Sequence, residues 1–237
     1  MTLRLDKYIA SALVLSRKDA AAAVRRGRVC VNGAAERSGD AKVDPARDSV
    51  TFDGAPVAYA EFLYFMLNKP AGLVCANEDK RDGTVMSLFP PEYLDKGIFT
   101  VGRLDKDTVG LLVVTNDGAL AHTLLSPKSH AEKTYLVTAD KPFLSEDIDT
   151  MRRGIVIEGK NTAPARLDLS SDNPYEARVT LTEGKFHEVK RLCYACGEKN
   201  VLALQRIRFA GLVLDQTLAE GKWRPLTGAE IKNLKSL

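Results

Sequence analysis

Residues 102–118 read Gly-Arg-Leu-Asp-Lys-Asp-Thr-Val-Gly-Leu-Leu-Val-Val-Thr-Asn-Asp-Gly. Within them, 111–114 is an apolar, partly β-branched run too short for a helix, and Asn-Asp-Gly at 116–118 is a signal that ends it. The preceding loop places Asp105 between two cations, Arg103 and Lys106, which favour an ionised carboxylate. The pattern predicts a reactive carboxylate supported by a buried strand. A solvated aspartate in an ordinary connection is the alternative that local pattern leaves open.

Composition places the chain among ordinary globular proteins. Of its 237 residues 45% are hydrophobic and 27% charged, and no apolar run approaches eighteen residues. The first residues lack the apolar core of a signal peptide, so we expect a cytoplasmic protein that does not enter a membrane. The four cysteines, at 30, 75, 193 and 196, are too few and too scattered for a disulfide framework.

The first thirty residues are more basic than the rest of the chain. They hold seven lysines and arginines against two aspartates, whereas the net charge of the whole chain is only +3. Helical spacing over 5–13, a cap at Ser16 and the hairpin signal Asn32-Gly33 predict two helices followed by a small sheet. A solvated charged face is one interpretation of the cations, and contact with RNA phosphates is the other. The residues concerned are Arg17, Lys18, Arg25, Arg26 and Arg28.

The remainder of the chain predicts an α+β domain. Residues 56–61 have no clear period and contain a proline, so we expect a linker there, between an N-terminal domain at 1–55 and a second domain at 62–237. A short helix is expected at 119–125, and Thr227 with Glu230 forms a capping box for a last helix. Strands are predicted at 64–67, 111–114, 133–138, 154–157, 165–169 and 177–181.

Residues 183–192 predict a helix of about three turns that Gly197 terminates. Cys193 and Cys196 follow on its apolar side. Since no second ligand pair accompanies them, we interpret them as core packing rather than as a zinc or redox site. His122 and His130 also lack ligand-spaced neighbours, so the sequence predicts no metal site.

Two stretches carry a family resemblance. Residues 102–118 closely resemble the GRLD-x-x-[ST]-x-G-L-L-L-[LM]-T-[ND]-D-G signature of the pseudouridine synthases. The stretch from Arg-Leu-Asp-Lys-Tyr-Ile at 4–9 to Val-Cys-Val-Asn-Gly at 29–33 is similar to the S4 RNA-binding domain. An S4 domain before a synthase domain is the organisation of the RsuA-type branch. This resemblance implies a small S4 domain and a catalytic domain with a mixed, largely antiparallel sheet.

The resemblance also assigns the reacting groups. It makes Asp105 the catalytic residue, either attacking the sugar or abstracting a proton. It makes Tyr135, in the Lys-x-Tyr motif, the aromatic residue that stacks on the base. The basic partner of the aspartate falls within 186–191, where alignment favours Lys190 over Arg191. These two point about 100° apart on a helix, so only one is expected to face the carboxylate.

Further residues are expected to shape the pocket or hold RNA. Leu204 would supply an apolar wall, and the Lys-Pro-x-Gly turn at 69–72 would shape the site rather than react. Arg191 would contact RNA if it faces away from the carboxylate. Arg103 either helps to fill the gap left by a flipped-out base or forms an ion pair with Asp107 or another acid.

The implied reaction converts a uridine into pseudouridine, an isomerisation that needs neither metal nor redox cofactor. Residues 64–75 and 132–138 are particularly like the small-subunit ribosomal RNA member of the branch. The expected partner is therefore ribosomal RNA or the assembling small ribosomal subunit, with the enzyme acting as a monomer. A large-subunit synthase of the same branch and a non-catalytic RNA-binding assembly factor are the alternatives.

Overall fold

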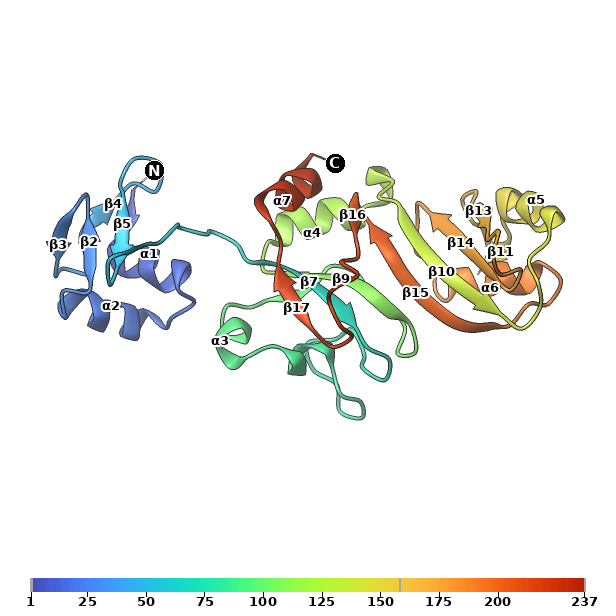
Figure 1. Ribbon diagram of the computed structural model, residues 1–237, viewed down its shortest axis with the longest axis horizontal. Coiled ribbons are helices and arrows are strands. Elements are labelled where there is room, and N and C mark those ends of the chain that lie inside the picture. Colours follow the sequence, from blue (N-terminus) through green and yellow to red (C-terminus); the bar gives the residue numbers. More distant parts are fainter. Residues whose placement is uncertain (1, 158, 237) are drawn as a thin grey trace. The chain divides into compact units, whose positions relative to one another are not determined.

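The computed structural model describes residues 2–157 and 159–236 and divides into two compact units (Figure 1). Unit 1 comprises Met1–Leu63 and Phe89–Ile98, and unit 2 comprises Tyr64–Leu88 and Phe99–Leu237. Among the described residues, no helix combines the length and apolar character needed to cross a bilayer.

Unit 1 contains the two helices and the small sheet that the sequence predicts. The Ser16 side chain accepts a hydrogen bond from the Asp19 amide and begins the second helix. Asn32 and Gly33 both have positive φ, 52° and 84°, as a tight hairpin requires. The helices and strands are α1 (Leu5–Ala12), α2 (Arg17–Arg25), α3 (Pro91–Leu94), β1 (Leu3–Arg4), β2 (Val29–Val31), β3 (Ala34–Glu36), β4 (Lys42–Val43), β5 (Val50–Phe52) and β6 (Ala55–Pro56). β3, β2, β5 and β6 form one sheet in that order, and β1 pairs with β4.

The segment expected to be a linker is part of this unit. β6 pairs with β5, so Ala55 and Pro56 lie in the sheet. The Tyr8 hydroxyl donates to the Val57 carbonyl at 2.8 Å, and the Tyr8 and Tyr59 rings lie 5.6 Å apart. Residues 56–61 are thus held against α1 by tyrosine contacts, a long-range effect that the absence of local periodicity could not indicate.

Unit 2 is built on a nine-stranded mixed sheet. Its main path runs β13-β14-β10-β15-β9-β7-β17, with β16 paired to β15 and β8 to β9. Every pairing is antiparallel except that of β15 with β9, which confirms a largely antiparallel α+β domain. The strands are β7 (Tyr64–Lys69), β8 (Phe99–Thr100), β9 (Val109–Thr115), β10 (Lys133–Ala139), β13 (Arg166–Leu169), β14 (Glu176–Leu181), β15 (Val201–Phe209), β16 (Leu212–Val213) and β17 (Trp223–Pro225), and β11 (Val156–Ile157) pairs separately with β12 (Lys160–Asn161).

The helices of unit 2 lie against this sheet, with α4 and α7 side by side near β9 and β17 (Figure 1). Asp117 caps α4 by accepting from the Leu120 amide at 3.0 Å, and the predicted Thr227 and Glu230 capping box is confirmed at the start of α7. The helices are η1 (Val85–Leu88), α4 (Gly118–Leu125), η2 (Pro127–Ser129), α5 (Ser145–Arg153), α6 (Glu188–Ala195) and α7 (Gly228–Lys235).

The prediction that a helix begins at residue 183 is wrong. α6 begins only at Glu188, because His187 has a left-handed backbone (φ 51°) and the Glu188 carboxylate accepts from the Lys185 amide at 2.7 Å. Residues 183–187 therefore form a loop. Cys193 and Cys196 are 0% and 2% exposed, which confirms that they pack in the core. Burial raises the pKa of these thiols to about 12 and about 11.

The parallel contact of β9 with β15 brings distant parts of the chain together. Gly110 is opposite Arg206 in the register and has φ 101°. A Cβ atom at Gly110 would lie 2.4 Å from the Arg206 carbonyl oxygen, so only glycine permits the two strands to approach this closely. The loop before β9 therefore lies beside the side chains of β15.

Candidate active site

The buried side chain of Lys69 holds the loop that carries Asp105. This lysine is fully buried at the end of β7, and its ammonium donates to the carbonyls of Pro70, Lys106 and Thr108 at 3.0, 3.3 and 2.9 Å. Burial lowers the pKa of Lys69. The Lys106 carbonyl also accepts from the Gly72 amide at 2.8 Å. The Lys-Pro-x-Gly turn therefore fixes the backbone on the C-terminal side of Asp105.

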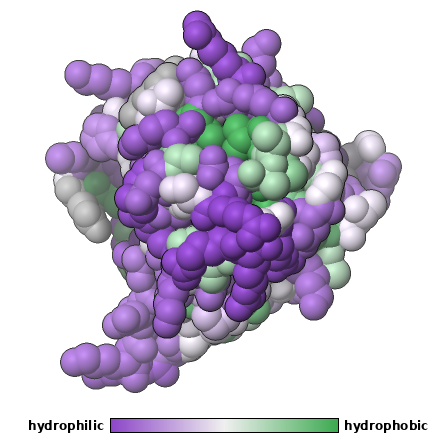
Figure 2. All heavy atoms as spheres, turned by 90° about the vertical axis from the view of Figure 1, so that its left-hand side faces the viewer, coloured by the Kyte–Doolittle hydropathy of each residue, from purple (hydrophilic) through white to green (hydrophobic). Residues whose placement is uncertain are grey.

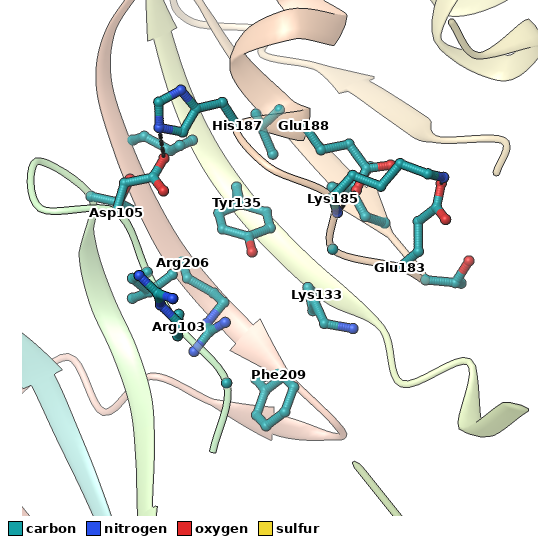
Figure 3. A pocket seen from close by; sticks show the side chains of 18 of the residues that line it. Arg103, Asp105, Lys133, Tyr135, Glu183, Lys185, His187, Glu188, Arg206 and Phe209 are labelled. Carbon is teal, nitrogen blue, oxygen red and sulfur yellow. Dashed lines mark hydrogen bonds and ion pairs between the residues drawn. The ribbon is translucent and has the colours of Figure 1, made fainter. Parts of the chain in front are cut away.

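A cavity of about 500 Å³ opens beside this loop. Its walls come from the loop, from β10 and β15, and from the segment that leads into α6 (Figure 3). The labelled side chains that line it are Arg103, Asp105, Lys133, Tyr135, Glu183, Lys185, His187, Glu188, Arg206 and Phe209. In Figure 3, Asp105 and His187 lie on one side of Tyr135, and Lys133, Glu183 and Lys185 on the other.

Asp105 has two basic neighbours from the start of α6. Lys190 Nζ lies 3.4 Å and His187 Nε2 3.6 Å from its Oδ2 atom. Lys190 also donates to both oxygens of Asp107 at 2.7 and 2.8 Å, which lowers the pKa of Asp107. One lysine therefore bridges two carboxylates of the same loop. Arg191 instead lies over the Phe186 ring, with its guanidinium carbon 5.4 Å from the centroid.

Tyr135 and Leu204 line the cavity with buried side chains. They are only 8% and 7% exposed, and both line the cavity. Tyr135 is opposite Arg206 in the pairing of β10 with β15. Arg206 Nε donates to the Leu111 carbonyl at 2.8 Å, while its Nη2 is buried without a hydrogen-bond partner among the described residues. An aromatic ring, an apolar side chain and a buried guanidinium thus line the inner part of the cavity.

The opposite wall is a cluster of acids and lysines. Glu188 is 3% exposed, and its Oε1 has no partner within the part of the chain that the structure describes. Burial raises the pKa of Glu188 to about 7, and the neighbouring Glu183 carboxyl adds to this rise. Glu183 is paired with Lys185 at 2.5 Å. Lys133 donates to the Ala131 carbonyl at 2.7 Å, and burial lowers its pKa.

Arg103 is exposed at the cavity and forms no ion pair within 2–157 and 159–236. The alternative ion pair with Asp107 is therefore absent from the structure, since Asp107 binds Lys190 instead. The guanidinium of Arg103 is therefore exposed at the cavity without an ion pair among the described residues.

The basic residues of unit 1 differ in their surroundings. Arg17 is paired with the buried Asp6 at 3.0 Å, and the hydrogen bond from Arg4 is the main reason that the pKa of Asp6 falls to about 2. Arg28 is paired with Asp53. Lys18, Arg25 and Arg26 are exposed and have no acidic partner in the described part of the unit. The face seen in Figure 2 is accordingly mostly hydrophilic.

Sequence reasoning missed several residues of the cavity, among them His187, Lys133, Glu188 and Arg206. His187 was not singled out, although its spacing of three from Lys190 is a signal that both could share one side of a helix. Lys133 and Glu188 lie in the same sequence motifs as Tyr135 and Lys190. Their burial depends on the packing of the 183–187 loop against β10, which no local pattern reveals. Among the described residues no cluster of three or more His, Cys, Asp or Glu side chains could hold a metal ion.

Comparison with known proteins identifies the family. Residues 63–195 match the family described as RNA pseudouridylate synthase, and residues 3–45 match the S4 domain. The chain belongs to the RNA pseudouridylate synthase family. The resemblance that its sequence motifs suggest is thereby confirmed.

Relatives of the synthase match it over nearly its whole length. A Bacillus subtilis protein named "Uncharacterized RNA pseudouridine synthase YtzG" is 42% identical over 97% of both chains. The "Ribosomal small subunit pseudouridine synthase A" of Haemophilus influenzae is 40% identical over 98% of this chain and 99% of its own. A solved structure titled "Crystal structure of pseudouridylate synthase" is 39% identical, has a TM-score of 0.69, and is matched over 98% of this chain and 99% of its own.

The two basic residues at the start of α6 should have separable effects. Lys190→Met removes the cation that bridges Asp105 and Asp107, so the synthase should lose the chemical step by orders of magnitude. Arg191→Met should mainly weaken RNA binding, because this side chain lies over Phe186 and away from the carboxylates. Single-turnover rates at saturating RNA measure the first effect, and RNA affinity measures the second. Loss of the chemical step in Arg191→Met alone would reverse the two roles.

Glu188 should make the stability of unit 2 depend on pH. The pKa of Glu188 in the folded protein, about 7, exceeds the ordinary glutamate value of 4.5. Between pH 4.5 and pH 7, Glu188 is ionised in the unfolded chain and protonated in the folded protein. The contribution of Glu188 to the free energy of unfolding is therefore fully present below pH 4.5 and is lost as the pH rises through 7. The loss is about 3 kcal/mol. Glu188→Gln keeps the shape of the side chain but cannot ionise, so this variant should not show the pH-dependent loss of stability.

Urea unfolding followed by the single tryptophan, Trp223, reports on unit 2. The stability of Glu188→Gln relative to the native protein should rise between pH 5 and pH 8, because contributions from other carboxylates cancel in the difference. A difference that stays constant with pH would show that Glu188 ionises normally in the folded protein.

Proposed function

We propose that this synthase converts a uridine of small-subunit ribosomal RNA into pseudouridine, with Asp105 as the catalytic group. The observation that carries the assignment is the placement of one carboxylate, held by Lys190 and His187, at a cavity whose inner wall is Tyr135 and Leu204. The small-subunit target is supported by the names of relatives that match nearly the whole chain.

The reaction exchanges one bond of the sugar for another. The C1′ to N1 bond of the uridine breaks, the uracil turns, and C1′ bonds to C5. The proton on C5 is then lost and N1 gains one, so no net oxidation occurs. Asp105 serves as an ionised carboxylate whether it attacks the sugar or removes a proton.

Other residues of the cavity hold the base while it turns. Tyr135 offers its ring for stacking, and Leu204 excludes water from one edge. Lys133 and Arg206 place positive charge at the inner part of the cavity, which favours the uracil when it carries the electron pair of the broken bond. Arg103, exposed beside the cavity, would enter the space that the flipped-out uridine leaves in the RNA.

RNA binding involves both units in this proposal. Lys18, Arg25 and Arg26 of the S4 domain would contact phosphates directly, with Arg17 and Arg28 contributing when phosphate competes with their aspartates. We place the S4 domain at 1–55 and the catalytic domain at 62–237, with 56–61 as a connection that packs against α1 of the S4 domain. The enzyme would act as a monomer in the cytoplasm, on free ribosomal RNA or on the assembling small subunit.

Replacing Asp105 tests the catalytic assignment. Cells that lack the protein should lose one pseudouridine from small-subunit ribosomal RNA, and the native gene should restore it. Asp105→Asn should not, because the amide can act neither as nucleophile nor as base, while its RNA affinity should stay within a few fold. The measurement is a map of the pseudouridine positions in both ribosomal RNAs of each strain.

The same map separates the alternatives. A lost modification in large-subunit RNA would move the target to that subunit. Restoration by Asp105→Asn would remove Asp105 from catalysis. If no modification disappears from cells lacking the protein, the ribosomal target is wrong.

A further inference from the structure

One side of α6 is partly exposed beside the active-site cavity. Lys190, Arg191 and Tyr194 are three and four residues apart and share one side of the helix, and His187, the residue before α6, lies beside them. The other side, with Val189, Leu192 and Cys193, is buried. Exposed helix sides normally alternate acids and bases, whereas this one contains bases and an aromatic residue and no acid.

This side of α6 lines a second hollow of about 380 Å³. Lys199, Asn200 and Val201 complete its wall. His187 and Lys190 line both this hollow and the cavity that contains Asp105, so the two adjoin. Anything that enters the hollow is next to whatever occupies the active site.

Aromatic surface is unusually available here. Tyr194 and Phe186 are 54% and 61% exposed. The Phe186 ring stacks on the His187 ring, with centroids 3.8 Å apart and planes 20° apart, and His187 lines both hollows. The left-handed backbone of His187 is unfavourable for a residue with a side chain, so this arrangement is retained at a cost.

Of the lysine and arginine side chains that line the hollow, only Arg191 is without an acidic partner among the described residues. Lys190 is engaged by Asp105 and Asp107, and Lys199 is buried with Asp147. Arg191 has no acidic partner among the described residues and lies over the Phe186 ring. A planar guanidinium at the rim of an aromatic hollow suits a phosphate next to a stacked base.

We propose that this hollow is a subsite for the nucleotide adjacent to the target uridine. Its base stacks on Tyr194, and Arg191 holds the phosphate that joins it to the target. The inference rests on the proposed function, because a flipped-out uridine leaves its neighbours with an unstacked face that the protein can cover. The subsite would thus help to hold the RNA open while the target is in the cavity.

Single-turnover kinetics with tyrosine variants test the subsite. The substrates are transcripts of both ribosomal RNAs labelled with tritium at C5 of uridine. Tyr194→Ala should raise the enzyme concentration at half-maximal rate about tenfold, because a base loses its stacking partner, and should leave the maximal rate within about twofold. Tyr194→Phe keeps the ring and should behave as the native enzyme. Tyr175→Ala, which removes another exposed tyrosine of unit 2, is the matched control.

A second measurement separates stacking from a merely structural role. In a short RNA spanning the modified uridine, each flanking base is replaced in turn by an abasic nucleotide. At one flank the native enzyme should lose about tenfold in affinity, and Tyr194→Ala should lose nothing further, because the two changes remove the same contact. Arg191→Met should reduce the slope of log affinity against log salt by about one.

The outcomes distinguish the subsite from the function on which it rests. Equal behaviour of Tyr194→Ala and Tyr175→Ala, or additive losses with both abasic RNAs, would overturn the subsite while the native enzyme stays active. Activity only on the large-subunit transcript would change the target and leave the tyrosine test valid. A native enzyme that is inactive on both transcripts and on assembling small subunits from cells lacking the protein would overturn the ribosomal function and the subsite together.

Discussion

The site depends on one buried ammonium group. Lys69 has no exposed surface and donates to three carbonyls, two of which belong to the residues just after Asp105. Burial of a lysine is costly, and the carbonyls together with the nearby carboxylates of Asp105 and Asp107 offset this cost. The same ammonium therefore holds the backbone of the Asp105 loop in place.

Acidic and basic side chains line different parts of the cavity beside this loop. Asp105 and Asp107 share Lys190 at one side, whereas Lys133 and Arg206 lie toward the inner part. Because Gly110 permits close contact of β9 with β15, the acid-bearing loop and the cation-bearing strand are fixed relative to each other. A preorganised arrangement of this kind costs no reorganisation when charge moves from the sugar to the base.

The sequence predicts elements whose signals are local. The strand at 111–114, the Ser16 cap, the Asn32-Gly33 turn and the α+β class all follow from short patterns, and the structure confirms them. The contacts of 56–61 with α1 do not, because they join residues far apart in the chain. The start of α6 depends on the left-handed backbone of His187, and α5 begins where the Leu144 amide donates to Asp147, and neither feature shows in the spacing of apolar residues. In the site, sequence motifs predicted that Asp105 lies near Lys190. The positions of His187, Lys133 and Glu188 at the cavity became clear only from the folded 183–187 loop.

The central claim is that Lys69 holds the loop of Asp105, and hydrogen exchange tests it most directly. The amides of Gly72 and Thr108, which donate to the Lys106 and Asp105 carbonyls, report on that loop. In Lys69→Met they should exchange much faster and activity should fall, while the strands of the central sheet stay protected. Lys106→Met is the control, since its ammonium lies at the surface with Asp82. Exchange and activity in Lys69→Met that match this control would contradict the account.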